Sequence, residues 1–313
     1  MPAGDKIAVQ VDGRDLTLTN LAKVLYPSDG FTKAEVLDYY QRISPVLLPH
    51  VAGRPMTLKR YPDGVNAESF FAKHAPAGLP DWVRTGEIET SSSRSKSPGE
   101  PVEYVVIDDL PSLIWAANLA ALELHVPMWR FPDHGKGSRS AAPEHGWTPD
   151  LLVFDLDPGA PATIVDCCRV AEALRPVLAE DGLDALPKTS GGKGLQLYAR
   201  IGDDRALTAE QASALAKAVA ERLERELPRL VVSRMTRSLR AGKVLIDWSQ
   251  NNGSKTTIAP YSLRAREQPT VSTPVTWNEV AACRDGSDLF FTAPDVLARV
   301  EEHGDLFGSL VTG

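Results

Sequence analysis

The most constraining stretch of the sequence is an apolar run that ends in two carboxylates, residues 151–158. Branched and aromatic residues bounded by Pro149 and Pro158 predict a buried strand. Side chains alternate between the faces of a strand, so Asp155 and Asp157 share one face. Adjacent carboxylates repel each other and are costly to desolvate, and a hard divalent cation removes both costs. An isolated D-x-D motif is more often a solvated pair, so a metal site needs support from other residues of the chain.

The length and composition of the chain allow one large domain or two lobes. Of its 313 residues 43% are hydrophobic, and helical and strand patterns are mixed. We expect an α/β (α+β) protein with one domain over residues 1–313, its two lobes meeting near residues 133–150. No apolar run is long enough to cross a membrane, no signal peptide is recognisable, and the three cysteines lack zinc or disulfide spacing. These features predict a cytoplasmic protein without membrane contact.

One segment is strongly basic although the chain has a net charge of −7. Residues 229–266 contain eight Lys or Arg and a single acid, Asp247. Such a segment is typical of a phosphate-binding site. A solvated basic face balanced by acidic helices explains it equally well.

A second strand with an embedded acid is predicted inside this basic segment, at residues 244–250. Asp247 would need a partner there if it is buried. A metal ion shared with Asp155 and Asp157 would supply one. We expect a tight turn and a returning strand over residues 251–263.

A glycine-rich turn at residues 190–194 carries Ser190 and Lys193. Backbone N–H groups, a hydroxyl and an ammonium are suitable ligands for a triphosphate. The spacing differs from that of a Walker A loop, so the turn alone does not establish nucleotide binding.

The N-terminal region contains a capping box at residues 32–35, which predicts the start of a helix that Pro45 should bend or shorten. Three polar residues, Asn20, Lys23 and Lys33, could gather near this helix start, where an anion is favoured. Ordinary surface polarity is the simpler explanation of their presence.

Further along the chain, an apolar helix is predicted from Pro111 to about His125. A histidine at the end of a buried helix is more often structural than catalytic. Residues 56–62 predict a strand that ends in a basic pair. Phe70 and Phe71 follow, and either one of them is exposed and can stack on a base or both are packed in the core.

Considered together, the three Asp residues, the Ser/Lys turn and the arginine-rich strands indicate one chemistry. Two divalent ions held by carboxylates can bridge a nucleoside triphosphate and an attacking hydroxyl. Cationic side chains neutralise the charge on the phosphates. The pattern predicts nucleotidyl transfer.

Four motifs, residues 154–158, 190–194, 238–243 and 247–252, closely resemble the polymerase domain of bacterial ATP-dependent DNA ligase D. This family belongs to the archaeo-eukaryotic primase superfamily and serves non-homologous end joining. The resemblance covers nearly the whole chain, from about Leu18 to Phe307. It implies a primase-like fold, in which a central, mostly antiparallel sheet with flanking helices carries an active-site cleft. It also implies extension of primer 3′ ends at gaps or double-strand breaks, preferably with ribonucleotides.

The resemblance further implies a role for each matching residue. Asp155 and Asp157 match the pair that holds both catalytic metals, Mn²⁺ or Mg²⁺, and Asp247 matches the third ligand. The nucleotide would be bound by Lys59, His125, Ser190, Gly191, Lys193, Arg240, Lys243, Gln250 and Arg264. The implied DNA contacts are Asn20, Lys23 and Lys33 for a 5′-phosphate, and Arg60, Phe70 and Phe71 for template and downstream DNA.

The resemblance also bears on partners and location. Residues 91–98 match a loop that helps to bridge two DNA ends, but this loop and residues 133–147 differ from the family in composition, which leaves end bridging and Ku docking open. No ligase or phosphoesterase segment is recognisable, so we expect either a stand-alone polymerase domain or a domain excised from a longer protein. We expect it to work with a separate DNA ligase at the bacterial nucleoid.

Two alternative functions use part of the same pattern. A two-metal nuclease would also cluster aspartates, but the Ser190, Lys193, Arg240 and Arg264 set favours a triphosphate. A non-catalytic DNA-end-binding module would need none of the three acids, which are intact.

Overall fold

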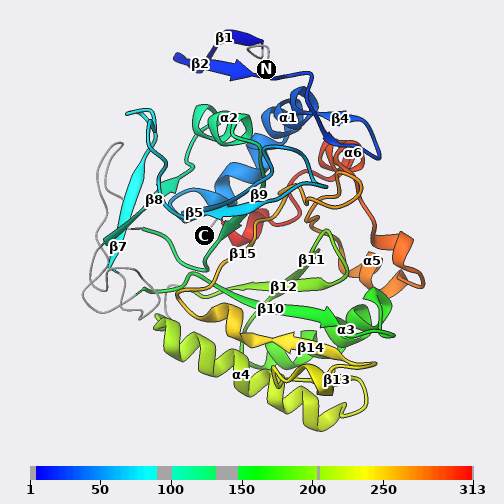
Figure 1. The fold of residues 1–313 in the computed structure, drawn as a ribbon. Helices are drawn as coiled ribbons and strands as arrows, with labels where there is room; N and C mark the ends of the chain where they lie inside the picture. The colour runs from blue at the N-terminus through cyan, green and yellow to red at the C-terminus, as the bar shows by residue number, and fades with distance from the viewer. Residues whose placement is uncertain (1–4, 90–100, 132–146, 203–204, 312–313) are drawn as a thin grey trace.

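Two β-sheets form the frame of the structure (Figure 1). The computed structural model describes residues 5–89, 101–131, 147–202 and 205–311. The first sheet has the order β11 (Ala185–Thr189), β12 (Leu195–Arg200), β10 (Leu151–Pro158), β14 (Val244–Asp247), β13 (Val231–Val232). Its neighbours are antiparallel except β13 and β14. The strand predicted from the D-x-D motif therefore lies at the centre of this sheet.

The second sheet is antiparallel throughout. Its order is β15 (Thr257–Ile258), β9 (Ala121–Val126), β5 (Pro55–Arg60), β8 (Pro101–Val106), β7 (Thr85–Glu89), with β6 (Phe70–Ala72) also paired to β5. Short β-hairpins precede it in the chain: β1 (Lys6–Val11) with β2 (Arg14–Thr19), and β3 (Val24–Tyr26) with β4 (Phe31–Thr32).

Helices cover the outer faces of both sheets. They are α1 (Lys33–Val51), α2 (Leu110–Asn118), α3 (Ile164–Glu180), α4 (Ala209–Glu226), α5 (Trp277–Ala282) and α6 (Ala293–His303). Figure 1 shows α1 and α2 beyond the second sheet and α4 beyond the first, so the two sheets face each other. The predicted N-cap Thr32 begins α1, and Thr208, Thr276 and Thr292 are the N-cap residues of α4, α5 and α6. The side chains of Thr32, Thr208 and Thr276 accept from backbone N–H groups of the first helical turn, which have no partner within the helix.

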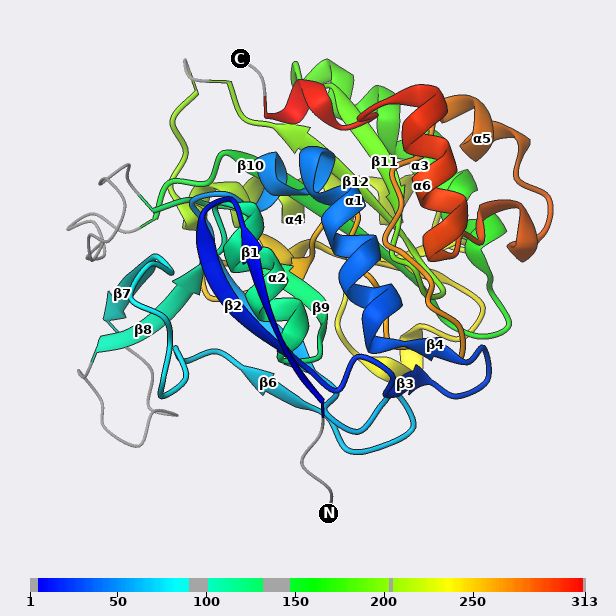
Figure 2. The same ribbon diagram turned by 90° about the horizontal axis from the view of Figure 1, so that it is seen from above.

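Each sheet has its own hydrophobic core. Residues of α1, α2 and α6 pack with β5 and β9 in one cluster, and α3 and α4 pack with β10, β12 and β14 in another. Phe154 and Leu156 point into the second of these clusters. Figure 2 shows the β1–β2 hairpin over α2, where Asn118 Nδ2 donates to Thr17 O at 2.9 Å. The fold is therefore the mixed, mostly antiparallel architecture that the sequence predicted.

The predicted helix ending at His125 is wrong. Helix α2 ends at Asn118, Ala120 adopts a left-handed φ of +56°, and residues Ala121–Val126 form strand β9. Both faces of β9 are largely buried, so the sequence lacks the alternation that distinguishes a strand from a buried helix.

Of the two effects expected of Pro45, a bent helix or a shortened one, shortening does not occur. Helix α1 continues through Pro45 to Val51. A proline leaves the carbonyl four residues earlier without its donor. Here that carbonyl is Gln41 O, and the Ser44 hydroxyl donates to it at 2.8 Å. The local cost of the proline is thereby reduced.

The predicted strand returning beside residues 244–250 does not form. Strand β14 ends at Asp247, a 3₁₀ turn follows at Trp248–Asn251, and the chain crosses to the second sheet as β15. The Asn251 side chain accepts from Val153 N at 2.8 Å and donates to Val153 O at 2.7 Å. Both edges of β14 are already paired, with β10 and with β13, so no edge is left for a returning strand.

Two expectations concern segments outside the described residues. The loop at residues 91–99 and most of the lobe boundary near residues 133–150 lie there. Within the described part of the chain, no helix has both the length and the apolarity needed to cross a bilayer.

Candidate active site

Three carboxylates meet where β10 and β14 pair. Asp155 lies directly opposite Asp247 in this antiparallel ladder, and Asp157 is two residues further along the same face of β10. Residues separated by 92 positions in the chain (247 minus 155) are therefore neighbours across one strand pair.

Burial and mutual repulsion dominate the electrostatics of these acids. Burial, followed by the like charge of Asp157, raises the pKa of Asp155 to about 7. Burial, followed by the charge of Asp247, also raises the pKa of Asp157. A cation at this place would relieve both effects.

The donor chemistry fits a hard divalent cation, because all three side chains offer carboxylate oxygens. Among the described residues, no group of three or more His, Cys, Asp or Glu side chains is arranged as a metal site. The Asp247 carboxylate is held by its neighbours: Oδ1 accepts from Ser249 N and Oγ at 3.1 and 2.6 Å, and Oδ2 accepts from Gln250 Nε2 at 2.9 Å. Asp155 and Asp157 are the two acids that line the adjoining cavity.

This cavity, about 420 Å³ in volume, is acidic on one side and basic on the other. Its walls come from both sheets and from the segment after β15. Its polar and charged lining includes His125, Ser190, Lys193, Gln250, Arg240, Arg264 and Arg266. The structure thus brings together most of the predicted nucleotide-binding residues beside the acids.

The glycine-rich turn is shaped by its close contacts. Gly191 has a left-handed φ of +66°, and a Cβ on Gly194 would lie 2.4 Å from the Leu156 carbonyl oxygen. The Ser190 hydroxyl accepts the N–H groups of Gly192 and Gly194 at 3.3 and 3.2 Å. Arg264 Nη1 donates to Ser190 O at 2.7 Å, which ties the turn to the basic segment. Only glycine allows the turn to approach β10 this closely.

A buried carboxylate that the sequence analysis missed, Glu123, links two of the predicted nucleotide contacts. Its Oε2 lies 3.0 Å from His125 Nε2, and its Oε1 accepts from Arg264 Nε at 3.3 Å and Ala265 N at 3.1 Å. Burial by itself would raise the pKa of Glu123, but the His125 hydrogen bond and the Arg264 charge lower it to about 2. Glu123 and His125 are two residues apart on one strand face, a signal hidden by the mistaken helix.

A buried lysine, also missed, lies behind the acids. Gln196 is opposite Asp155 in the β10–β12 ladder, and its Nε2 donates to Asp155 Oδ1 at 3.0 Å. Lys188 Nζ, whose residue is fully buried, donates to Gln196 Oε1 and Ser272 Oγ, both at 2.5 Å. The amide of Gln196 is thus oriented from one side by Lys188 and presents its N–H to Asp155. No sequence pattern shows this, because it depends on strand register.

Two aromatic rings lie exposed beside this cavity. Phe70 and Phe71 are 46% and 55% exposed, so both rings, and not only one, are open to solvent. Arg60 and Lys59 lie 5.1 and 5.4 Å from the centres of these rings, respectively, and the Phe71 ring is 5.7 Å from that of His125. Exposed rings flanked by cations are suited to base stacking.

Three predicted nucleotide contacts do not line this cavity: Gly191, Lys59 and Lys243, of which Lys243 is held by the chain after α4. Its ammonium donates to Pro228 O at 2.6 Å and does not line the cavity. This contact directs the side chain toward the segment that follows α4 (Ala209–Glu226), and the nucleotide role of Lys243 stays a prediction.

The three N-terminal polar residues lie together at the start of α1. Lys33 Nζ donates to Thr19 O at 2.6 Å, Lys23 Nζ pairs with Asp63 at 2.6 Å, and the backbone N–H of Lys23 donates to Asn20 O at 3.0 Å. Burial, followed by the charge of Lys23, lowers the pKa of Lys33 to about 8. Two cations held this close together favour an anionic ligand.

Comparisons with known proteins find a family, relatives and a solved structure that are similar to this chain. The family described as LigD, primase-polymerase domain matches residues 32–307. The multifunctional non-homologous end joining protein LigD of Mycolicibacterium smegmatis is 45% identical over 94% of this chain, and the bifunctional LigD of Bacillus subtilis is 32% identical over 92%. The matches span only 36% and 43% of those relatives. The solved polymerase domain of Mycobacterium tuberculosis ligase D in complex with DNA has 44% identity and a TM-score of 0.83, covering 95% of this chain and 98% of that one.

Proposed function

Because this chain belongs to the LigD primase-polymerase family, we propose that it extends primer 3′ ends by template-directed nucleotidyl transfer at gaps or double-strand breaks in DNA. The observation that carries the proposal is the two-sided cavity, in which Asp155 and Asp157 face Lys193, Arg240 and Arg264. A nucleoside triphosphate needs cations along its phosphates and a metal-binding acid cluster at the α-phosphate. Few other substrates call for both in one cavity.

Different residues of the chain would bind the phosphates and the metal ions. Lys193, Arg240 and Arg264 would neutralise the triphosphate, and Asp155, Asp157 and Asp247 would hold two Mn²⁺ or Mg²⁺ ions. Bound ions of this kind polarise the phosphate and lower the pKa of the attacking 3′-hydroxyl. Lys59 and His125 lie on the second sheet, where the nucleotide sugar would face them, in keeping with a ribonucleotide preference.

Primer extension tests the proposal directly. Gapped and 3′-overhang DNA would be incubated with NTPs or dNTPs and with Mn²⁺ or Mg²⁺, and we expect elongated primers, more from NTPs. Shortening of labelled DNA with metal and no nucleotide would favour a two-metal nuclease. DNA binding without any product would favour a non-catalytic end-binding module. The relatives are named non-homologous end joining proteins. Ku and a separate DNA ligase are therefore the partners to add in a reconstituted reaction.

Glu123→Gln should raise the KM for nucleotide about tenfold, because His125 and Arg264 lose their shared anion and one charge-assisted hydrogen bond each is weakened. Steady-state extension with increasing NTP measures this, and kcat should change much less. Glu301→Gln, which alters an exposed carboxylate that pairs with Arg42, is the matched control. An unchanged KM in the Glu123 variant would contradict the positioning role.

The preference for a 5′-phosphate at the downstream end should fall as the pH rises through about 8. Lys33 is charged below its pKa and neutral above it, so its attraction for a phosphate dianion is complete at lower pH and lost at higher pH. The ratio of dissociation constants for 5′-hydroxyl and 5′-phosphate gaps, measured from about pH 7 to 9.5, checks this. Lys33→Arg stays charged over that range and should show a flat ratio. A flat ratio in the unaltered protein would contradict the prediction.

A further inference from the structure

The ladder between β10 and β14 ends at the acids. Its last pair is Asp155 with Asp247. Continuing this register by two residues on each strand would place Ser249 opposite Val153. Ser249 does not take that position, because the chain leaves the sheet as the 3₁₀ turn at Trp248–Asn251. The backbone N–H and C=O of Val153 on this side of β10 therefore need another partner.

The side chain of Asn251 supplies that partner. Its Oδ1 accepts from Val153 N at 2.8 Å, and its Nδ2 donates to Val153 O at 2.7 Å and to Trp248 O at 3.0 Å. A side-chain carboxamide offers the same kinds of donor and acceptor as a peptide group, so Asn251 occupies the ladder position that Ser249 leaves. The residue is 3% exposed, and these bonds are therefore shielded from water.

Because Ser249 is released from the ladder, it is available to Asp247. The backbone N–H and the hydroxyl of Ser249 donate to Asp247 Oδ1 at 3.1 and 2.6 Å, and Gln250 Nε2 donates to Oδ2 at 2.9 Å. In a regular antiparallel ladder the N–H of Ser249 would instead donate to Val153 O. The turn that holds the Asp247 carboxylate is thus anchored by Asn251 to β10, the strand of the other two acids.

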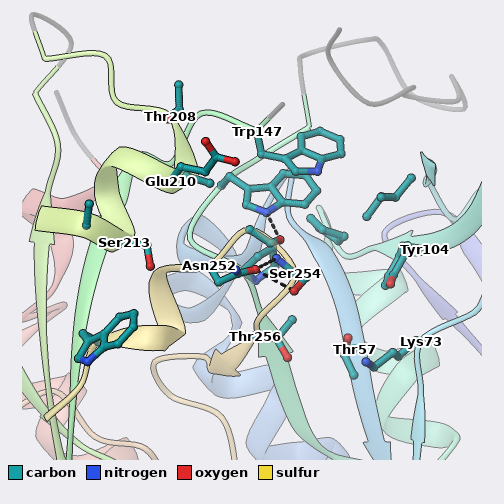
Figure 3. Close-up of a pocket in the computed structure, with 18 of the residues that line it drawn as sticks. Thr57, Lys73, Tyr104, Trp147, Thr208, Glu210, Ser213, Asn252, Ser254 and Thr256 are labelled. Atoms are coloured by element: carbon teal, nitrogen blue, oxygen red, sulfur yellow. Dashed lines mark hydrogen bonds between the residues drawn. The ribbon is translucent and has the colours of Figure 1, made fainter. Parts of the chain in front are cut away.

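Asn251 lines neither of the two cavities that adjoin its turn. The preceding residue, Gln250, lines the cavity that holds the acids. The following residue, Asn252, lines a second, larger cavity of about 880 Å³ between helix α4, the 3₁₀ turn and the second sheet (Figure 3). Trp248, directly after Asp247, lines this larger cavity too. A ligand in either cavity would meet the neighbours of Asn251, so Asn251 can act on it only through them.

We propose that Asn251 is a positioning residue for the acid cluster, because it holds Asp247 in place by standing in for a strand residue. The inference rests on the proposed polymerase function and adds a residue to it. Without the carboxamide, the turn after Asp247 loses its anchor on β10, and the Asp247 carboxylate can move away from Asp155 and Asp157. A divalent ion bound by the three acids would then be held less tightly, whereas the cations that face the triphosphate would keep their places.

Asn251→Ala tests the proposal, because it removes both bonds to Val153. In the metal-free protein, amide hydrogen exchange at Val153 should accelerate about tenfold. Exchange at Phe154, which lies opposite Leu197 in the β10–β12 ladder, should stay slow. Mn²⁺ affinity, measured by electron paramagnetic resonance, should fall about ten- to a hundredfold. On a primer–template without a downstream strand, kcat should fall to a similar extent, and the KM for NTP should stay within about twofold.

A second variant and a matched control separate positioning from stability. Asn251→Gln keeps both hydrogen-bonding groups on a longer side chain, so it should fold but displace the turn, and we expect the same losses. Asn118 makes the same two kinds of bond to a strand: Thr19 N donates to its Oδ1 at 3.1 Å, and its Nδ2 donates to Thr17 O at 2.9 Å. It lies beside the β1–β2 hairpin, away from the first sheet (Figure 1). Asn118→Ala should lower the melting temperature and leave Mn²⁺ affinity and kcat unchanged.

The outcomes separate this proposal from the proposed function. If the unaltered protein extends primers but both Asn251 variants keep normal Mn²⁺ affinity and kcat, the positioning role is refuted and the polymerase function stands. Equal losses in Asn118→Ala would also refute it, because general destabilisation would then explain them. If the unaltered protein extends no primer, the proposed function fails, and Mn²⁺ affinity and amide exchange at Val153 still decide whether Asn251 positions the acid cluster.

Discussion

Asp155→Asn should reduce primer extension at least about a thousandfold, because losing a metal-binding carboxylate removes roughly 4 kcal/mol of transition-state stabilisation. DNA binding should remain, since phosphate contacts elsewhere dominate it. Single-turnover extension and gel-shift binding measure the two quantities separately. Asparagine keeps an oxygen that can accept from Gln196 Nε2, so the fold around the site is preserved.

The same variant should be more stable than the unaltered protein in the presence of a chelator. Folding raises the pKa of Asp155 from its ordinary 3.8 to about 7, mainly by burial and then by the charge of Asp157. The folded chain therefore binds a proton more tightly than the unfolded chain, and stability falls as the pH rises from about 4 to 7. Above pH 7 the whole penalty is present, and the variant lacks it.

Melting temperatures measured in EDTA at about pH 4.5 and pH 8 test whether the variant is more stable than the unaltered protein. The advantage of Asp155→Asn should be small at the lower pH and about 3 °C or more at the higher one, given roughly 2–4 °C per kcal/mol for a large domain. A variant that is inactive and also less stable at pH 8 would contradict the account of the acid cluster. Full activity in the variant would contradict the active-site assignment itself.

Lys188→Met should lower kcat about ten- to a hundredfold, the usual effect of removing a group that orients a metal ligand. Lys188 fixes the orientation of the Gln196 amide, and Gln196 in turn donates to Asp155. Without the lysine the amide can rotate, and the Asp155 carboxylate loses its fixed position. The KM for nucleotide should remain near normal, because Lys188 is fully buried and does not line the cavity.

Ser272→Ala is the control for this variant. It removes the other hydrogen-bond acceptor of Lys188 and leaves the Lys188–Gln196–Asp155 chain intact. We expect near-normal kcat for it, with some loss of stability. Titration of Mn²⁺, followed by electron paramagnetic resonance, should show weaker metal binding only in the Lys188 variant. Equal metal affinity in all three proteins would assign Lys188 a purely structural role.

Much of the fold was predictable from local sequence patterns. The Thr32 cap, the strand at residues 151–158 and the strand that carries Asp247 formed where capping chemistry and periodicity placed them. The errors have two different causes. Residues 121–126 form a strand that is buried on both faces, so it shows no alternation. The helix continues past Pro45 where the Ser44 hydroxyl donates to the carbonyl that the proline leaves without a donor, and no periodicity reveals this contact.

The residues of the candidate site likewise fall into those that the sequence could reveal and those that it could not. The D-x-D motif and the glycine-rich turn could be found as motifs because neighbouring residues in the chain create them. Glu123, Gln196 and Lys188 could not, because each acts through a residue on another strand or through the register of strand pairing. The role of Lys243 stays a prediction for the corresponding reason: its motif is intact, but its side chain donates to Pro228 O.

The sequence by itself determined which chemical groups the protein carries: three acids, a glycine-rich turn and a basic segment, each defined by neighbours along the chain. Only the tertiary structure decided that Asp247 lies opposite Asp155, that a buried glutamate joins His125 to Arg264, and that a second cavity opens beside Asp247. The physical reason is that strand pairing and sheet packing are set by side chains distant in sequence, whose contacts form only when the two cores assemble.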